Sequence, residues 1–287
     1  MNKYVIITDS SSDLTPDILS DPALSLLQLD VLVEGEEARP NCDVDIKEFY
    51  GKLRAKLGAT TSAVNIDNFL ALFESYLKDG FDVLYLGFSS GLSGTYNAGL
   101  VAAKELAEKY PERKIYALDT LAASLGQGLL VNYAVNMKND GADIETVRDF
   151  IEENKLHLCH WFTVDDLFFL KRGGRVSAAT AVVGSMLSIK PVLHVDNKGR
   201  LISVSKARGR KAAIDALFEK MKETAIDPEG QTVFISHGDV IEDAEYLANR
   251  IRNELHVKEV KIGYVGPVIG AHAGPGVLAL FFIGSER

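Results

Sequence analysis

Short apolar runs, many of them rich in β-branched residues, alternate along this chain with longer amphipathic stretches. The runs predict strands and the amphipathic stretches predict helices. The predicted strands cover residues 4–8, 83–87, 115–118, 157–163, 189–195, 201–205, 232–236, 260–264 and 277–283. The predicted helices cover residues 46–57, 66–78, 95–109, 122–138, 144–154, 208–221 and 241–255. Strand and helix alternate in the first half, which predicts an α/β fold whose parallel sheet has helices on both faces.

The second half of the chain contains a hairpin signal. Residues 196–200 (Asp-Asn-Lys-Gly-Arg) join two predicted strands, and Asn-Lys-Gly is typical of a tight turn between antiparallel strands. We therefore expect a mixed sheet there. We predict an N-terminal domain over residues 1–155, with three α/β/α layers and a parallel sheet, and a C-terminal α/β domain over residues 156–287.

The charge of the chain argues against several kinds of partner. The net charge is -9 over 287 residues, so the clustered cations that nucleic acids and anionic membranes require are not expected. The apolar run at the N-terminus meets Asp9 too early for a signal peptide. No segment approaches the roughly 20 apolar residues that span a bilayer. We expect a cytoplasmic protein without stable membrane insertion.

The two cysteines, Cys42 and Cys159, lie far apart without metal-ligand spacing. We interpret both as buried, reduced thiols, and we expect no metal site.

Residues 89–95 (Ser-Ser-Gly-Leu-Ser-Gly-Thr) form a hydroxyl-rich loop between a predicted strand and a predicted helix. In an open parallel sheet, ligands bind beyond the carboxyl ends of the strands, and a helix N-terminus favours an anion. One such serine is most often a helix cap, but three serines, a threonine and two glycines favour a ligand loop. The loop has no lysine and no G-x-G-x-x-G spacing, so it lacks the usual nucleotide motifs.

Four further segments are candidates for function. Residues 60–62 (Thr-Thr-Ser) precede a predicted helix that Asn65 caps, and they form a polar cup if they lie near Ser93. Residues 9–13 (Asp-Ser-Ser-Ser-Asp) are interpreted as turn and capping residues. Residues 263–276 are half Gly and Pro, which predicts a tightly turned loop that places His272. Residues 171–175 (Lys-Arg-Gly-Gly-Arg) are typical of a helix C-terminus, although these cations also suit a phosphorylated ligand or an acidic partner.

Taken together, these segments resemble the DegV family, including the fatty-acid-binding (FakB type) subunits of bacterial fatty-acid kinase. The resemblance runs nearly end to end, through residues 8–10, 61–62, 89–96, 172–177 and 266–276. It implies a two-domain α/β fold that holds one long-chain fatty acid between the domains. A separate ATP-dependent kinase then phosphorylates the presented carboxylate, so the chain itself has no catalytic residue and no cofactor.

The resemblance also implies roles for individual residues. Thr61 and Ser93 match positions that bind the carboxylate, and His272 matches a histidine close to it. The supporting residues of these loops are Ser62, Gly94, Thr95 and Gly270. Arg172 and Arg175 are candidates for contact with a partner or a phosphate. Many members continue Thr-Ser with Gln-Pro, where this chain has Ala63-Val64, so the turn after Thr61 is expected to differ.

Two alternatives remain at this point. One is a hydrolase or transferase with Ser93 as nucleophile and His272 as base, although the chain has no G-x-S-x-G elbow and no evident third member. The other is a lipid-responsive regulator without a kinase. For a carrier, the tunnel lining is expected from residues 66–78 and 178–187.

Overall fold

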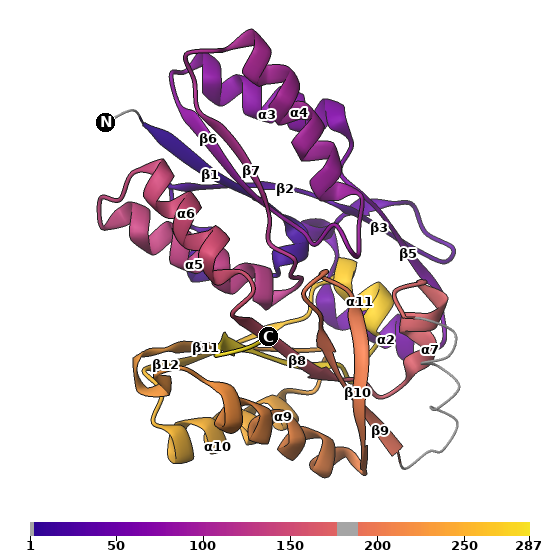
Figure 1. Ribbon diagram of the computed structural model, residues 1–287. Coiled ribbons are helices and arrows are strands. Elements are labelled where there is room, and N and C mark those ends of the chain that lie inside the picture. The colour runs from indigo at the N-terminus through magenta and orange to yellow at the C-terminus, as the bar shows by residue number, and fades with distance from the viewer. Residues whose placement is uncertain (1–2, 177–188) are drawn as a thin grey trace.

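The computed structural model describes residues 3–176 and 189–287, and it is an α/β protein with the predicted parallel sheet in its first half (Figure 1). The strand order is β2-β1-β6-β7, and all neighbours are parallel. The strands are β1 (Tyr4–Asp9), β2 (Leu24–Leu27), β6 (Asp82–Gly87) and β7 (Ile115–Asp119). Helices cover both faces of this sheet: α3 (Ile66–Lys78) and α4 (Thr95–Lys109) on one, α5 (Leu125–Asn139) and α6 (Ile144–Asn154) on the other.

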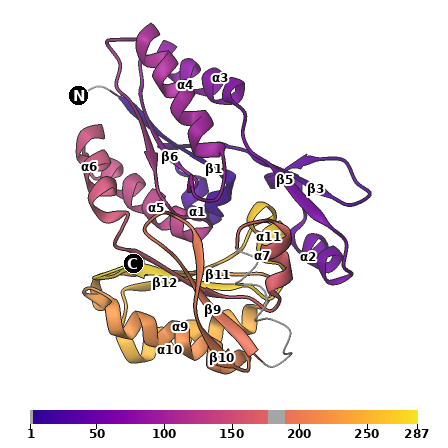
Figure 2. The same ribbon diagram turned by 45° about the vertical axis from the view of Figure 1, so that its right-hand side comes forward.

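The second half forms the predicted mixed sheet, with the strand order β10-β9-β8-β13-β11-β12. Its strands are β8 (Leu158–Thr163), β9 (Ile189–Val195), β10 (Leu201–Arg208), β11 (Thr232–His237), β12 (Glu259–Tyr264) and β13 (Leu278–Ile283). The predicted β9–β10 hairpin is confirmed, and Gly199 in its turn has φ +70°. The outer face carries α9 (Arg210–Thr224) and α10 (Ile241–Leu255), while α5 packs on the inner face against β11 and β13 (Figures 1 and 2).

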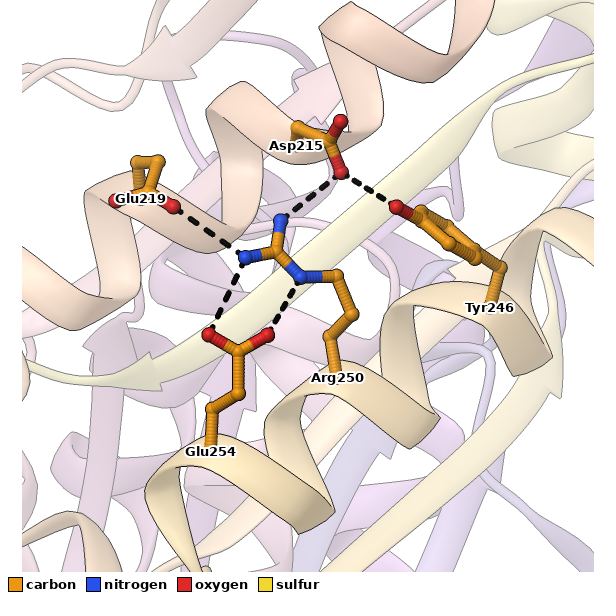
Figure 3. A network of polar contacts seen from close by, with 5 residues as sticks. All are labelled: Asp215, Glu219, Tyr246, Arg250 and Glu254. Atoms are coloured by element: carbon orange, nitrogen blue, oxygen red, sulfur yellow. Dashed lines mark hydrogen bonds and ion pairs between the residues drawn. The ribbon is translucent and has the colours of Figure 1, made fainter.

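A polar network joins the two outer helices (Figure 3). Arg250 of α10 donates to Asp215 of α9 at 2.9 Å and to Glu254 at 2.8 Å, and Tyr246 donates to Asp215 at 2.8 Å. A longer contact of 3.4 Å reaches Glu219. The network fixes α10 against α9 on the side of the sheet that faces away from α5.

A third, antiparallel sheet was not anticipated from the sequence. Its strand order is β4-β3-β5, with β3 (Asp30–Val33), β4 (Arg39–Pro40) and β5 (Ala59–Ser62). These strands are too short and too polar to stand out as apolar runs. The other helices of the described residues are α1 (Pro16–Leu19), α2 (Ile46–Arg54), α7 (Leu167–Arg172) and α11 (Pro267–Ala273), with 3-10 turns at Ser10–Ser12, Asn41–Asp43 and Pro228–Gly230.

Two predicted segments differ in the structure. Residues 263–276 are not one turned loop, because α11 occupies their centre, with Pro267 at its first turn and Gly274 (φ +79°) after its end. The helix predicted from residue 122 begins at Leu125 instead, since Leu121 and Ser124 adopt positive φ values. Pro at a first turn and Gly after a last turn are the usual boundaries of a helix.

The buried core follows the sheets. One cluster fills the space between the two large sheets around α5, a second lies between the parallel sheet, α3, α4 and the small sheet, and a third lies under α9 and α10. Cys159 is buried, but the prediction that Cys42 is buried is wrong, because Cys42 is exposed. The division at residues 155 and 156 falls in the turn between α6 and β8, and we retain it as a proposal.

Within residues 3–176 and 189–287, no helix is long and apolar enough to cross a membrane. The same part of the chain contains no cluster of His, Cys, Asp and Glu suited to a metal ion.

Candidate functional site

A cavity of about 300 Å³ lies where the two large sheets, the small sheet and α11 meet. This volume is at the lower end of the range of small-molecule pockets, about 300–1,000 Å³. Most of its lining is apolar. The apolar lining side chains are Leu29, Ala63, Phe88, Leu92, Ala123, Phe162, Leu170, Leu201, Val265, Val268, Ile269, Ala273, Val277 and Ala279. Such a lining suits a ligand with a long apolar part.

The partly exposed part of the cavity lining carries polar side chains. The structure brings Thr61 of β5, Ser93 of the β6–α4 loop and His272 of α11 to this part of the lining, together with Gly94 and Arg175. The segments are far apart in sequence, but α11 packs against both β5 and α7 (Figure 2). Thr61 Oγ1 lies 2.8 Å from His272 Nε2, so these two side chains are directly hydrogen-bonded.

His272 is neutral at physiological pH. Burial, and then the charges of Arg175 and Arg172, lower its pKa from 6.5 to about 4. A neutral imidazole offers one donor and one acceptor nitrogen, which lets it share a hydrogen bond with Thr61 without adding a cation.

Ser93 lines the cavity just before α4, whose N-cap residue is Gly94. Its Oγ lies 2.9 Å from Thr95 Oγ1 and accepts from the Thr95 N–H at 3.2 Å. Thr95 itself is fully buried behind Ser93 and supports its hydroxyl. These contacts orient the Ser93 side chain at the N-terminus of α4. A helix N-terminus also favours the binding of an anion.

The other serines of this loop have different partners. Ser89 is fully buried, and its Oγ donates to the Gly199 carbonyl of the β9–β10 turn at 2.8 Å. The Ser90 N–H donates to Asp119 at 3.2 Å while its side chain is exposed. Ser89 Oγ also accepts from the Gly91 N–H at 3.2 Å, so this serine both stabilises the turn of the loop and joins it to the second sheet.

Asp9, in the segment of residues 9–13, supports the β6–α4 loop. Asp9 accepts from the Ser11 N–H at 3.2 Å, which confirms its capping role. It also accepts from the Tyr85 hydroxyl at 2.9 Å and from the Phe88 N–H at 3.1 Å. Burial raises the pKa of Asp9, and these hydrogen bonds oppose that rise. The sequence did not indicate that Asp9 fixes the start of the β6–α4 loop.

The two predicted arginines lie at different depths. As expected, α7 ends at Arg172, followed by Gly173 and by Gly174 with φ +70°. Arg175 turns back into the cavity and donates from Nε to the Leu92 carbonyl at 3.2 Å, and burial lowers its pKa. Arg172 is exposed, stacks over Phe169 at 5.1 Å, and lines an outer hollow beside Thr61 and His272.

The supporting residues divide into lining and packing positions. Gly94 lines the cavity, whereas Ser62 is exposed outside it. Gly270 packs α11 against α2, because a Cβ there would lie 2.7 Å from Tyr50 Oη. Residues 66–78 were wrongly expected to line the tunnel, since no residue of α3 faces the cavity. Ser177 and the second expected lining segment, residues 178–187, lie outside the described residues.

Three polar lining residues were missed by the sequence analysis: Ser124, His160 and Ser236. All three are almost fully buried, with 3%, 5% and 0% exposure, and we call this buried polar part of the lining the inner end of the cavity. They stand singly among apolar residues in the sequence, so no motif indicated them.

Comparisons with known proteins agree with this architecture. The sequence profile of the DegV family of uncharacterised proteins matches residues 3–285. A DegV domain-containing protein of Clostridium perfringens is 48% identical over 289 residues, covering 100% of this chain and 99% of the relative. A fatty-acid-binding DegV family protein from Thermus thermophilus matches with TM-score 0.89 and 28% identity over 99% of this chain and 100% of that one. DegV of Bacillus subtilis, a fatty-acid-binding protein, matches with TM-score 0.85 and 30% identity over the same shares.

Proposed function

The chain belongs to the DegV family, and from this premise we propose that it binds one long-chain fatty acid and presents its carboxylate to a separate ATP-dependent kinase, as a subunit of the FakB type. The observation that carries the proposal is the apolar cavity that ends in Thr61, Ser93 and His272. An acyl phosphate made in this way would enter phospholipid metabolism. Because the partner kinase uses ATP, we place this function in the cytoplasm.

The apolar lining supports tight binding of an acyl chain. Burial of one CH₂ group contributes about 0.8 kcal/mol, so a chain of about 16 carbons gains roughly 10 kcal/mol before entropy costs. The head group then determines orientation more than affinity. This matches a site with a long apolar wall and few polar side chains at its partly exposed end.

The partly exposed residues Thr61, Ser93 and His272 form the head-group end of this proposal, and they support a carboxylate without neutralising it. A buried carboxylate requires hydrogen bonds, and the hydroxyls of Thr61 and Ser93 are placed on the cavity to donate them. His272 is neutral and hydrogen-bonded to Thr61. Single donors of this kind leave one carboxylate oxygen available to attack a phosphoryl group, which a bidentate arginine would engage more fully.

The hydrolase or transferase alternative finds less support. A serine nucleophile needs its base within hydrogen-bond reach. In this structure Ser93 Oγ is paired with Thr95 and His272 Nε2 with Thr61. The regulator alternative uses the same lipid site. It differs from the proposed kinase subunit only in that no kinase accepts the bound lipid.

Native mass spectrometry of the purified chain tests the proposal. We expect a mass excess of one fatty acid that disappears on denaturation, both as purified and after incubation with hexadecanoic acid. A covalent acyl adduct on Ser93 would support the enzyme instead, and the absence of any bound lipid after incubation would overturn the proposal.

A further inference from the structure

We propose that the inner end of the cavity is a second polar subsite, and that the ligand is a fatty acid whose chain carries a neutral oxygen, such as a hydroxyl group. This inference rests on the proposed function and specifies the substrate class of the same cavity. An unsubstituted alkyl tail gives the inner end nothing to hydrogen-bond, whereas a hydroxylated tail does.

The polar side chains of the inner end form a connected set. Ser124 Oγ lies 3.1 Å from Ser236 Oγ and donates to Asp13 Oδ2 at 2.5 Å. Burial raises the pKa of Asp13 to about 7, and in its ionised form the carboxylate accepts the Ser124 proton. Ser236 can then donate to Ser124, which leaves the lone pairs of Ser236 Oγ as acceptors on the cavity wall. A hydroxyl group of a ligand can donate to them.

The sheet register provides space beside these groups. Ser236 of β11 is paired with Ala279 of β13, which is paired in turn with Phe162 of β8. Because the side chain of Ala279 is small, it leaves space in the cavity between Ser236 and Phe162. His160 lies two residues before Phe162, so it projects from the same face of β8 and lines the same cavity.

His160 supplies an unused polar group. It is 5% exposed, and its Nδ1 is buried without a hydrogen-bond partner. Burial, and then the charges of Arg287 and His194, hold its pKa well below 6.5, so the ring is neutral. Buried polar groups are nearly always paired in folded proteins. The His160 ring lines the cavity with its Nδ1 unpaired beside Gly126 of α5, and it offers this nitrogen to a ligand oxygen.

The backbone of Ser124 is a separate observation that supports a role for its side chain. Its φ of 53° and ψ of -148° lie in a region that almost only glycine adopts without strain. A glycine would adopt these backbone angles at the start of α5 with less strain. The serine is therefore explained by its hydroxyl, which the strained backbone directs towards Asp13 and the cavity.

Charge selects a neutral oxygen over a second carboxylate. Asp13, whose pKa burial raises to about 7, accepts from Ser124, and His160 is neutral, so among the described residues the inner end presents no cation to the cavity. A terminal carboxylate there would lie beside another acid without a compensating charge. The predicted ligands are thus hydroxylated monocarboxylic acids rather than dicarboxylic acids.

The test compares the affinity of the full chain for octadecanoic acid with that for its 10-, 12- and 18-hydroxy derivatives and for octadecanedioic acid. We expect at least one hydroxy acid to bind about tenfold tighter than octadecanoic acid, the equivalent of one additional buried hydrogen bond. The dicarboxylic acid should bind more weakly than the preferred hydroxy acid. Ser236→Ala and His160→Phe should each remove the preference while octadecanoic acid still binds.

Ser124→Gly is the critical variant, because it removes the hydroxyl and relieves the backbone at once. We expect it to melt no lower than the unmodified chain and to lose the hydroxy-acid preference, whereas Ser90→Ala, outside the cavity, should keep it. Equal or weaker binding of all hydroxy acids, as when ordered waters fill the inner end, would overturn the inference. Failure of every acid to bind would instead reject the proposed function.

Discussion

Thr61 Oγ1 lies 2.8 Å from His272 Nε2, although 211 positions separate the two residues in sequence. The pair joins β5 of the small sheet to α11, which arrives from the C-terminal part of the chain. A bound carboxylate would meet a hydroxyl whose orientation is already set by a neutral imidazole. Preorganised donors of this kind lose little freedom on binding.

Replacement of Thr61 by valine should weaken fatty-acid binding, although it preserves the shape of the side chain. The substitution keeps the β-branch but removes the hydroxyl, and it leaves His272 Nε2 without its partner. We expect affinity for hexadecanoic acid to fall about tenfold. Thr61→Ser should restore most of it. A fluorescent-lipid displacement assay measures both, and unchanged affinity in Thr61→Val would contradict the assigned head-group end.

The buried His272 should make stability depend on pH in a defined interval. Its pKa is lowered from 6.5 to about 4, so between these values the unfolded chain binds a proton here that the folded chain does not. The free energy of unfolding should therefore fall as pH drops from 6.5 towards 4, by up to about 3 kcal/mol from this residue.

Urea denaturation at pH 7 and pH 4.5 measures this effect. His272→Gln should reduce the difference in unfolding free energy between the two pH values, since it removes the titrating group. His256→Gln, at an exposed position, is the matched control and should leave the difference unchanged. Equal differences in all three proteins would show that other groups carry the pH dependence.

Two glycine-to-alanine substitutions separate packing from helix propensity. At Gly270 of α11, a Cβ would lie 2.7 Å from Tyr50 Oη and 3.0 Å from Phe49, so overpacking should destabilise the chain by about 1–3 kcal/mol. At Gly51 of α2, nothing lies within 4 Å, and alanine should stabilise by about 0.5–1 kcal/mol. Thermal unfolding measures both, and a shared sign would contradict the packing argument.

The sequence predicted long elements far better than short ones. The helices at residues 66–78 and 144–154 were placed to the residue, because their apolar periodicity is preceded by Asn65 and Asp143, which cap them as N-cap residues do. The strand at Ala59–Ser62 was missed, because Ala-Thr-Thr-Ser becomes a strand only through pairing with β3. Tertiary context decides such segments rather than local preference.

The site was predictable only where its residues formed motifs. Ser93 and Thr61 stood out as clustered hydroxyls, and the structure places them on one cavity. The contact between Ser89 and Gly199 could not be predicted, because it depends on how the hairpin meets the first sheet. The positive φ of Ser124, the residue before α5, is equally invisible in the sequence.

Ser89→Ala should shorten lipid retention without removal of any head-group contact. The Ser89 hydroxyl donates to the Gly199 carbonyl and connects the β6–α4 loop, which carries the lining residues Leu92 and Ser93, to the β9–β10 turn. The loss should cost about 1–2 kcal/mol of stability and should speed lipid release more than it slows uptake. Stopped-flow displacement measures the rates, and Ser90→Ala is the control. Equal release rates would show that this contact does not restrain the cavity.

Arg172→Ala should separate lipid binding from lipid presentation. Arg172 is exposed on the outer hollow beside the head-group end, and its guanidinium stacks on Phe169 rather than on a carboxylate. If a kinase delivers its phosphoryl group at this face, loss of this cation should slow acyl-phosphate formation about tenfold or more and leave lipid affinity within about twofold. Arg172→Lys keeps the charge but not the planar guanidinium, so its rate of acyl-phosphate formation should be intermediate.

Lys171→Ala on the same helix turn serves as the matched control. Acyl-phosphate formation by a fatty-acid kinase, measured with each lipid-loaded variant, gives the comparison. Equal rates in all variants would assign the kinase contact to another face, and a parallel loss of lipid affinity would place Arg172 in the binding site itself.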